Sequence, residues 1–360
     1  MMGKKAIVAM SGGVDSSVAA LILKQQGFDL IGATMKLFDN EDVGVCAKNT
    51  CCSLKDIDDA RNIAYELNIP YYVFNFSHKF KSAVIDKFIH AYENGLTPNP
   101  CIDCNRYLKF DKLLQRAREL NFDYVATGHY AQVEYNQKRG RWILKKATDP
   151  HKDQSYVLYS LTQEQLSRTL FPLGKMNKNE VRKIAKSNNF NNAKKHDSQD
   201  ICFIKNGKYS DFIKSHTNKN YPPGNFVDVD GNLLGLHKGI IHYTIGQRKG
   251  LGLSFPEPMY VLKIHPQTNQ ITLAPNEKTY TKTLIARDIN LISKENLYVK
   301  TKIKAKVRYN QQEQWAFAVQ LNSNQIKVEF EKPQRAITKG QAVVLYDEDV
   351  VVGGGTICET

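Results

Sequence analysis

A segment rich in glycine and serine near the N-terminus has the residue types of a phosphate-binding loop. It reads Ser11-Gly12-Gly13-Val14-Asp15-Ser16-Ser17 and lies between an apolar run and a stretch with helical spacing. Glycines let the backbone approach an anion closely, and the N–H groups at the start of a helix point at it. The hydroxyls of Ser16 and Ser17 can donate further bonds, and Asp15 is placed to hold a magnesium ion. The segment predicts a site for nucleotide phosphates.

Two common nucleotide-binding patterns are missing from this loop. It contains no lysine, so GxxxxGK[ST] is absent, and GxGxxG is absent as well. These absences argue against transfer of a γ-phosphoryl group and against a dinucleotide. The plain alternative is a tight turn that uses its glycines for geometry alone, but such a turn has no need of the serines and the aspartate.

Cysteines supply a second set of reactive groups. Cys101 and Cys104 form a CxxC pair directly after Thr97-Pro98-Asn99-Pro100, and Cys202 lies in the segment DSQDICF. Such thiols can bind a metal, exchange disulfides or carry sulfur. A second pair at zinc-site spacing is missing, whereas Cys101, Cys104 and Cys202 together would suit an iron–sulfur cluster with one open iron.

The remaining four cysteines carry no comparable pattern. Cys46, Cys51 and Cys52 form a group near an expected loop, for which local packing is the plain interpretation, and Cys358 in the tail is expected to be incidental. The total of seven is odd and too low for a disulfide scaffold. The N-terminus enters a strand pattern without a secretory leader, and no run of about 18 apolar residues is present. We expect a cytoplasmic protein with no membrane partner.

Short apolar runs alternate with helix-like stretches in the first half of the chain. Strands are expected over residues 5–10, 28–35, 69–74 and 124–128. Helices are expected through Val18, Leu21 and Ile22 to a stop at Gly27, from 56 to 67 and from about 110 to 120. This alternation predicts a parallel sheet covered on both faces. Ligands collect at the carboxyl ends of such strands, where Gly12, Gly13 and Gly128 lie.

Glycine and proline become frequent after about residue 205, and short β-like runs dominate from about residue 276. The predicted fold is an α/β N-terminal domain with a Rossmann-like parallel sheet over residues 1–205. A small mixed or β connecting domain follows over 206–275, and a C-terminal β-barrel over 276–360. With 360 residues, the chain is long enough for two or three such domains.

The charge balance favours a polyanionic partner. Fifty basic and 36 acidic residues give a formal net charge of +14, which points first to nucleic acid. Lys300, Lys302, Lys304, Lys306 and Arg308 alternate with mostly apolar residues, so a strand would carry five positive charges on one face. Such a face can follow a phosphate backbone. The plain alternative is an edge strand that its lysines protect against aggregation.

Taken together, the motifs resemble a known family. The first loop resembles the signature of the PP-loop ATP pyrophosphatases. Nine segments in order resemble the tRNA-specific 2-thiouridylases, from Met10 to near the C-terminus: SGGVDSS, TCCSLKDIDDAR, TPNPCIDCN, ATGHYA, KDQSYVL, PLGKMNKNEVRKIA, DSQDICFI, YTIGQRKGLG and GQAVVLYD. The ordered set is far more specific than any one segment. The resemblance implies a tRNA-uridine 2-sulfurtransferase that uses ATP and Mg²⁺.

The resemblance also implies where ATP binds and what it does. A uracil carbonyl oxygen is a poor leaving group, and adenylation of the C2 oxygen of a wobble uridine would turn it into an AMP ester. The products would be 2-thiouridine, AMP and pyrophosphate. Met35 and Gly128 would frame the adenosine. The implied ATP-binding residues are Ala9, Met10, Ser11, Gly12, Gly13, Val14, Asp15, Ser16, Met35 and Gly128.

For the sulfur, the resemblance implies a persulfide on Cys202, loaded by a sulfur-donor protein. Cys104 matches the nucleophile, which would act on the activated carbon or release sulfide from Cys202, ending as a transient Cys104–Cys202 disulfide. Many members carry Asp where this chain has Cys101, so the general acid/base is left open. Asp103 is one substitute, and the third thiol of Cys101 keeps the cluster alternative open.

The implied tRNA contacts are Asn99, His129, Lys152, Asp153, Gln154, Arg308, Tyr309 and Gln341. Asn99 would touch the target base, since an unstacked base in an anticodon loop can be splayed into a pocket. Taken alone, His129 would be a satisfied structural histidine, and Lys152 and Gln154 would be ordinary loop residues.

Two other functions are compatible with parts of the sequence. One is a PP-loop enzyme that adenylates a small molecule, which the basic strand and the β-rich tail argue against. The other is a non-catalytic RNA-binding protein, which the intact loop from Ser11 to Ser17 argues against.

Overall fold

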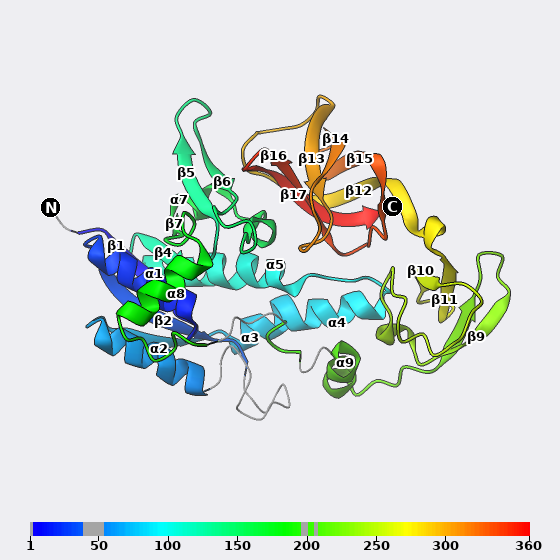
Figure 1. Ribbon diagram of the computed structural model, residues 1–360, viewed down its shortest axis with the longest axis horizontal. Helices are drawn as coiled ribbons and strands as arrows, with labels where there is room; N and C mark the ends of the chain where they lie inside the picture. Colours follow the sequence, from blue (N-terminus) through cyan, green and yellow to red (C-terminus); the bar gives the residue numbers. More distant parts are fainter. Residues whose placement is uncertain (1–2, 39–53, 196–200, 205–207) are drawn as a thin grey trace.

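The computed structural model describes residues 3–38, 54–195, 201–204 and 208–360 (Figure 1). The expected group of Cys46, Cys51 and Cys52 therefore lies outside the described residues. No helix among the described residues is long and apolar enough to cross a membrane.

The N-terminal part is built on a parallel sheet. Its strands follow the order β3-β2-β1-β4-β7, and every neighbouring pair is parallel. The four strands expected from the sequence are confirmed: β1 (Lys5–Ala9), β2 (Asp29–Lys36), β3 (Tyr71–Asn75) and β4 (Tyr124–Thr127). The short β7 (Thr169–Leu170) was not expected.

Helices cover both faces of this sheet, as the sequence predicted. Alternate residues of β1 point to opposite sides: Val8 packs in a cluster with α1, α2 and α8, whereas Ile7 packs with α6. These helices are α1 (Val14–Gln25), α2 (Leu54–Glu66), α6 (Leu113–Glu119) and α8 (Lys178–Ser187). Figure 1 shows the blue and green helices beside the blue strands.

The helix expected from about residue 110 is longer than predicted. It begins as α5 (Pro100–Cys104), continues as the π-helical η2 (Asn105–Lys112) and ends as α6. A second helical run follows β3, with α3 (Ser77–Phe80), η1 (Lys81–Ile85) and α4 (Asp86–Glu93). Asn99 followed by Pro100 is a typical helix N-terminus. The prediction, which followed apolar spacing, instead began the helix about ten residues later.

The connecting part follows α9 (Tyr209–Thr217) and contains a four-stranded sheet in the order β10-β11-β8-β9. Phe226, Val261 and Ile271 are fully buried in its core. The strands are β8 (Gly224–Val227), β9 (Leu233–His237), β10 (Met259–His265) and β11 (Gln270–Pro275), with a 3-10 turn η5 at Ile240–His242.

The C-terminal part is a closed six-stranded β-barrel, as expected. Its sheet runs β12-β15-β14-β13-β16-β17, and a further pairing of β12 with β17 closes it. Its strands are β12 (Tyr280–Leu291), β13 (Thr301–Lys306), β14 (Gln314–Gln320), β15 (Gln325–Arg335), β16 (Ala342–Asp347) and β17 (Val350–Glu359), after a 3-10 turn η6 at Asn276–Thr279.

The barrel is joined to the N-terminal part by main-chain pairing. β17 also pairs with β6 (Arg141–Lys145), which forms a hairpin with β5 (Gln132–Asn136). Below this hairpin, one hydrophobic cluster contains Tyr156 of η3 (Ser155–Leu158), Leu166 of α7 (Gln163–Ser167) and Tyr346 of β16. The barrel thus packs directly on the elements around the predicted site.

Candidate functional site

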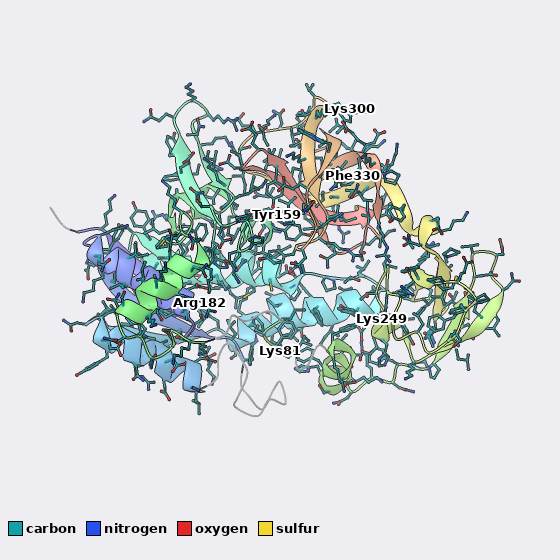
Figure 2. The ribbon with its side chains drawn as sticks, viewed as in Figure 1. Lys81, Tyr159, Arg182, Lys249, Lys300 and Phe330 are labelled. Atoms are coloured by element: carbon teal, nitrogen blue, oxygen red, sulfur yellow. The ribbon has the colours of Figure 1, made fainter. Side chains whose placement is uncertain are left out.

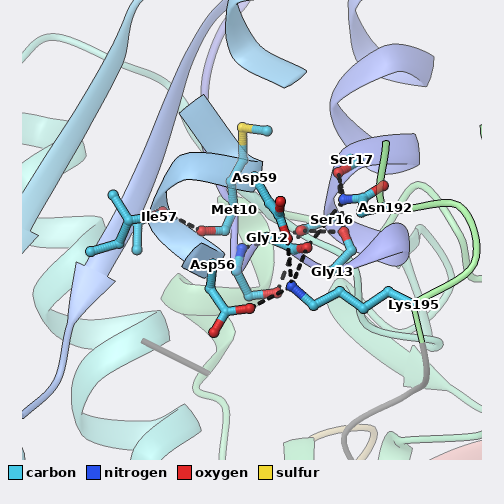
Figure 3. A network of polar contacts seen from close by, with 12 residues as sticks. Met10, Gly12, Gly13, Ser16, Ser17, Asp56, Ile57, Asp59, Asn192 and Lys195 are labelled. Carbon is cyan, nitrogen blue, oxygen red and sulfur yellow. Dashed lines mark hydrogen bonds and ion pairs between the residues drawn. The ribbon is translucent and has the colours of Figure 1, made fainter. Parts of the chain in front are cut away.

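The predicted phosphate-binding loop connects the carboxyl end of β1 to the N-terminus of α1. Gly13 is the N-cap of α1, and the hydroxyls of Ser16 and Ser17 each donate to its carbonyl at 3.1 Å (Figure 3). The N–H of Ser11 donates to Oγ of Ser16 at 3.2 Å. The loop is thus folded onto the first turn of the helix, whose N–H groups attract anions.

Gly12 explains why this loop needs a glycine at its second position. It has a φ of +70°, and a Cβ added there would lie 2.8 Å from Cα of Asp56, at the start of α2. Both the left-handed backbone and the close approach exclude a side chain. The loop is therefore held between α1 and α2.

Asp15 lies at the start of α1 and is bound by two side chains. Nζ of Lys178 lies 2.8 Å from both carboxylate oxygens, and the hydroxyl of Tyr130 donates to Oδ1 at 2.7 Å. Asp15, where the sequence led us to expect a magnesium ion, is thus paired with an ammonium group.

A further pair of side chains contacts the loop from the segment after α8. The Asn192 amide donates to the carbonyl of Gly12 at 3.1 Å and to Oγ of Ser17 at 2.9 Å. Nζ of Lys195 also donates to the carbonyl of Gly12, at 3.1 Å, and pairs with Asp56 and Asp59 (Figure 3). Burial alone would lower the pKa of Lys195, but the bonds to these two carboxylates outweigh it and raise that pKa.

Sequence reasoning missed Asn192 and Lys195 and gave no role to Lys178. Lys178 lies within the segment PLGKMNKNEVRKIA, which was recognised only as part of the family pattern. Asn192 is only 3% exposed, a burial that no local sequence signal reveals. Their contacts show that the 178–195 segment forms one wall of the loop.

The two expected adenosine neighbours lie at the carboxyl edge of the same sheet. Met35 is near the end of β2, and Gly128 directly follows β4. A Cβ at Gly128 would lie 2.7 Å from the backbone nitrogen of Ser16, so this residue packs against the loop itself. Strand β1 separates β2 from β4, so Met35 and Gly128 flank the loop on opposite sides.

The cysteines of α5 differ in exposure. Asn99 caps the helix, and its Oδ1 accepts the N–H of Cys101 at 3.2 Å. Cys101 is exposed, whereas Cys104 is 9% exposed. Cys104 belongs to a hydrophobic cluster against which the partly buried Cys202 and Met35 also pack. The structure thus brings the two predicted sulfur-handling cysteines into one cluster, beside the end of β2.

Asp103, the suggested acid/base substitute, faces a lysine. Nζ of Lys87 lies 3.6 Å from its Oδ1. Burial raises the pKa of Asp103, and Lys87 opposes that rise. Within the parts of the chain that the structure describes, no three His, Cys, Asp or Glu side chains gather to hold a metal ion. The iron–sulfur alternative therefore gains no support.

Three of the expected tRNA contacts form internal bonds. His129 is buried, its Nδ1 lies 2.7 Å from Oγ1 of Thr127, and burial, aided by Lys109, lowers its pKa well below the usual value. Asp153 accepts the N–H groups of Ala147 and Ser155, and Gln154 accepts the N–H of Tyr130. These side chains fix the turns that follow β4 and β6.

Three more link the barrel to the rest of the chain. Nη2 of Arg308 donates to the carbonyl of Ile245 in the connecting part at 3.4 Å and, within the barrel, to the carbonyl of Ala336 at 2.8 Å. The hydroxyl of Tyr309 donates to the carbonyl of Asp153 at 3.2 Å. The amide of Gln341 donates to the carbonyl of Thr97 at 3.0 Å.

A cleft of about 300 Å³ lies where Tyr309 meets the turn before η3. Its lining is mostly polar and charged: Pro150, His151, Asp153, Lys306, Tyr309, Asn310, Gln311 and Gln312. Burial lowers the pKa of Lys306, and Asp153 opposes that shift. Among the expected tRNA-binding residues, the structure therefore brings Asp153 and Tyr309 to one opening between the N-terminal part and the barrel.

The basic strand is β13, and it is not an edge strand. It pairs with β14 on one side and β16 on the other, which contradicts the aggregation-protection alternative. Ile303, Ala305 and Val307 are buried, as the alternation predicted, but Val299 precedes the strand and is 79% exposed. Lys300 and Lys302 pair with Glu329 and Glu331, and Figure 2 shows Lys300 at the top of the barrel. Part of the positive face is thus neutralised.

Comparisons with known proteins cover nearly the whole chain. A family model described as a tRNA methyl transferase HUP domain matches residues 4–206, a tRNA methyl transferase PRC-barrel domain matches 210–275, and an aminomethyltransferase beta-barrel domain matches 281–357. A solved 4-thiouridine synthetase in complex with RNA and ATP has 18% identity and a TM-score of 0.39, covering 60% of this chain and 50% of that one. That likeness is too distant to support an argument.

The curated relatives are much more similar. The tRNA-specific 2-thiouridylase MnmA of Clostridioides difficile (strain 630) is 51% identical over 99% of this chain and 98% of its own length. The protein of the same name from Lachnoclostridium phytofermentans (strain ATCC 700394 / DSM 18823 / ISDg) is 49% identical over 98% and 99%. With this similarity over the full length, the chain belongs to the tRNA-specific 2-thiouridylase family.

Proposed function

We propose that this chain uses ATP to activate the C2 carbonyl oxygen of a wobble uridine in tRNA and then replaces that oxygen with sulfur. The oxygen attacks the α-phosphorus of ATP, and pyrophosphate leaves. The oxygen now belongs to an AMP ester, which departs when sulfur bonds to C2. The products are 2-thiouridine, AMP and pyrophosphate, and the reaction takes place in the cytoplasm, where tRNA and ATP meet.

The observation that carries this proposal is the packing of Cys104 and Cys202 in one cluster beside the carboxyl end of β2. Both cysteines contact the cluster that Met35 of β2 also joins. Strand β2 pairs with β1, and the N–H of Met10 donates to the carbonyl of Ala33 at 2.8 Å, directly before the loop. A nucleotide bound from Ala9 to Ser16, between Met35 and Gly128, would therefore lie at the same edge of the sheet as the thiols.

In this proposal, a donor protein loads Cys202 with sulfur as a persulfide. The Cys104 thiolate attacks the Cys202 sulfur of that persulfide, the S–S bond breaks, and hydrosulfide leaves with the electron pair. Hydrosulfide then attacks C2 and displaces AMP, while a Cys104–Cys202 disulfide remains for a thiol reductant to reopen. Burial of Cys104 suits this chemistry, because a shielded site keeps water from hydrolysing the activated base.

We place the tRNA across the junction of the N-terminal part and the barrel. Asn99 adjoins the cysteine helix and is proposed to contact the target base. The cleft is lined by Lys306 and Tyr309, and Lys152 lies between two of its lining residues in the sequence. The positive groups of the two lysines suit backbone phosphates. Asp153, Gln154, His129 and Arg308 are proposed to support this surface through their internal bonds, and Gln341 through its bonds to the carbonyls of Thr97 and Pro98.

The test is mass spectrometry of unmodified tRNA incubated with the protein, ATP and a persulfide donor. We expect a mass gain of the uridine equal to the replacement of oxygen by sulfur, with one AMP and one pyrophosphate released per base. Exchange of pyrophosphate into ATP with no need for tRNA would instead indicate adenylation of a small molecule. Tight tRNA binding with no ATP turnover would indicate a non-catalytic RNA-binding protein.

A further inference from the structure

The connection between β15 and β16, residues 336–341, contacts two other parts of the chain. Ala336 at its start lies against Gly246 of the connecting part, where an added Cβ would come within 2.6 Å of the Ala336 Cβ. Its carbonyl accepts Nη2 of Arg308, which also donates to Ile245 at 3.4 Å. Ala336, the first residue of this barrel loop, is thus held against the connecting part of the chain.

The other end of the connection contacts the segment before the cysteine helix. The N–H of Thr97 donates to the carbonyl of Lys339 at 3.0 Å. The amide nitrogen of Gln341 donates to the carbonyls of Thr97 and Pro98 at 3.0 and 3.4 Å. In these three bonds, Thr97 donates through its N–H group, and Thr97 and Pro98 accept through their carbonyls.

Gly340, between those two barrel residues, is needed for the close approach. It has a φ of +90°, and an added Cβ would lie 3.1 Å from Cβ of Leu96 and from the backbone nitrogen of Thr97. The backbone of Gln341 is itself fixed, because its carbonyl accepts the N–H of Ile357 in β17 at 2.8 Å. The contact is therefore made by a braced loop of the barrel.

The sequence of the contacted segment makes these bonds important. Pro98 and Pro100 have no N–H group, so the segment 97–100 has few donors of its own with which to form a turn. Its carbonyls must find donors elsewhere, and Gln341 supplies one to each of two consecutive carbonyls. Asn99, the next residue, caps the helix that carries Cys104.

From this arrangement we infer that Gln341 is a positioning residue, which sets the place of Cys104 through the backbone of Thr97 and Pro98. The barrel then completes the catalytic site even before RNA binds. This role differs from the direct tRNA contact that the family resemblance implies for Gln341. The inference rests on the proposed function only where it concerns turnover, because its structural part concerns the protein without RNA.

The first test is hydrogen–deuterium exchange of the full-length protein without tRNA. Gln341→Met keeps the size of the side chain but removes its two donors. Peptides that span residues 96–104 are expected to exchange about tenfold faster in this variant, since their local opening is less opposed. Lys339→Ala is the matched control, because its exposed side chain is removed while its carbonyl bond to Thr97 remains; it should exchange at the wild-type rate.

The second test separates positioning from RNA contact by kinetics. A misplaced nucleophile lowers kcat, whereas a lost ground-state contact raises KM. Gln341→Met is expected to lower kcat for thiolation about tenfold, with the KM for tRNA changed less than about twofold. Gln341→Lys keeps an N–H donor and should recover much of the exchange protection, which also shows that the position tolerates substitution.

Unchanged exchange over 96–104 in Gln341→Met, together with a raised KM for tRNA, would overturn the inference in favour of direct contact. If the wild-type protein thiolated no tRNA, the proposed function would fail while the exchange result still decided the structural role of Gln341. If Gln341→Met did not fold, Gln341→Glu, which has a similar size and no N–H donor, would be compared with Lys339→Ala: faster exchange over 96–104 would support the inference, and equal exchange would overturn it.

Discussion

The ammonium group of Lys178 lies 2.8 Å from both carboxylate oxygens of Asp15, although 163 positions separate the two residues. The Lys178 side chain is 10% exposed and that of Asp15 is 30% exposed. A pair this sheltered from water is screened little by salt. It joins the first turn of α1 to α8 and neutralises a negative charge within the loop where the phosphates of ATP are proposed to bind.

Replacement of Lys178 by Met should therefore weaken both the fold and the nucleotide site. Loss of one partner leaves a partly buried carboxylate, so the free energy of unfolding should fall by about 1–3 kcal/mol. The unpaired negative charge should also repel the phosphates and raise the KM for ATP about tenfold. Urea unfolding and ATP titration of the thiolation rate measure the two effects. Lys183→Met, on the exposed face of the same helix, is the control; equal results for both variants would refute a special role for Lys178.

The proposed sulfur chemistry predicts different defects for the two cysteines. Cys202→Ser cannot carry a persulfide, so radioactive sulfur from a donor should no longer label the protein at that residue. Cys104→Ser should still be labelled but should release no sulfide, because the attacking thiolate is missing. Both variants should lose at least about 10³-fold in thiolation rate. Cys358→Ser, in the barrel, should retain full activity. Thiolation that persists in both Cys104→Ser and Cys202→Ser would exclude the proposed roles.

The N-terminal sheet could be predicted from sequence because its signals are local. Its strands are short apolar runs, of which β1, β2 and β4 are mostly buried, and the loop from Ser11 to Ser17 directly follows β1. Strand β13 shows where local reasoning ends. Its alternation correctly predicted which face is buried, but its position between β14 and β16 depends on chain closure far along the sequence. An edge strand and a central strand can share one alternating pattern.

The parts of the site that escaped prediction are those made by distant pairs. Asn192 and Lys195 contact Gly12 from about half the chain away, and neither lies in a pattern with a known mechanism. Gln341 was assigned to RNA by resemblance, while its bond to Thr97 spans 244 positions. Periodicity and spacing describe neighbours in sequence, so contacts of this kind require the folded structure.

Burial of His129 predicts a pH dependence of stability near neutrality. Its pKa is lowered in the folded protein, so the unfolded chain binds more protons once the pH falls below the ordinary value of 6.5. The contribution is fully present above pH 6.5 and is lost as the pH falls toward the lowered pKa, by up to about 1.4 kcal/mol per pH unit. His129→Asn should flatten the unfolding free energy between pH 7.5 and pH 5.5, each of these being about one unit from 6.5.

The control for this measurement is His78→Asn, which replaces an exposed histidine. The lowered pKa values of His237, His242 and His265 act in the same direction in every variant, so they cancel in the comparison. An identical pH dependence in wild type and His129→Asn would show that the folded protein admits a proton at this histidine.

The outer face of β13 predicts how tRNA binding should depend on salt. Each lysine that neutralises a phosphate adds about 0.7–0.9 to the slope of log affinity against log salt. Lys304 lies over the ring of Trp315, 5.3 Å from its centroid, whereas Lys302 is paired with Glu331 at 2.7 Å. If RNA follows this face, Lys304→Gln should reduce the steepness of the slope by about that amount, whereas Glu331→Gln should tighten binding because it releases Lys302. Filter binding without ATP, from low to moderate salt, measures both.

Lys186→Gln, which replaces an exposed lysine on α8, is the control for this measurement and should leave the slope unchanged. A slope unaffected by Lys304→Gln would place the bound RNA at the cleft beside Tyr309 and away from the outer face of β13.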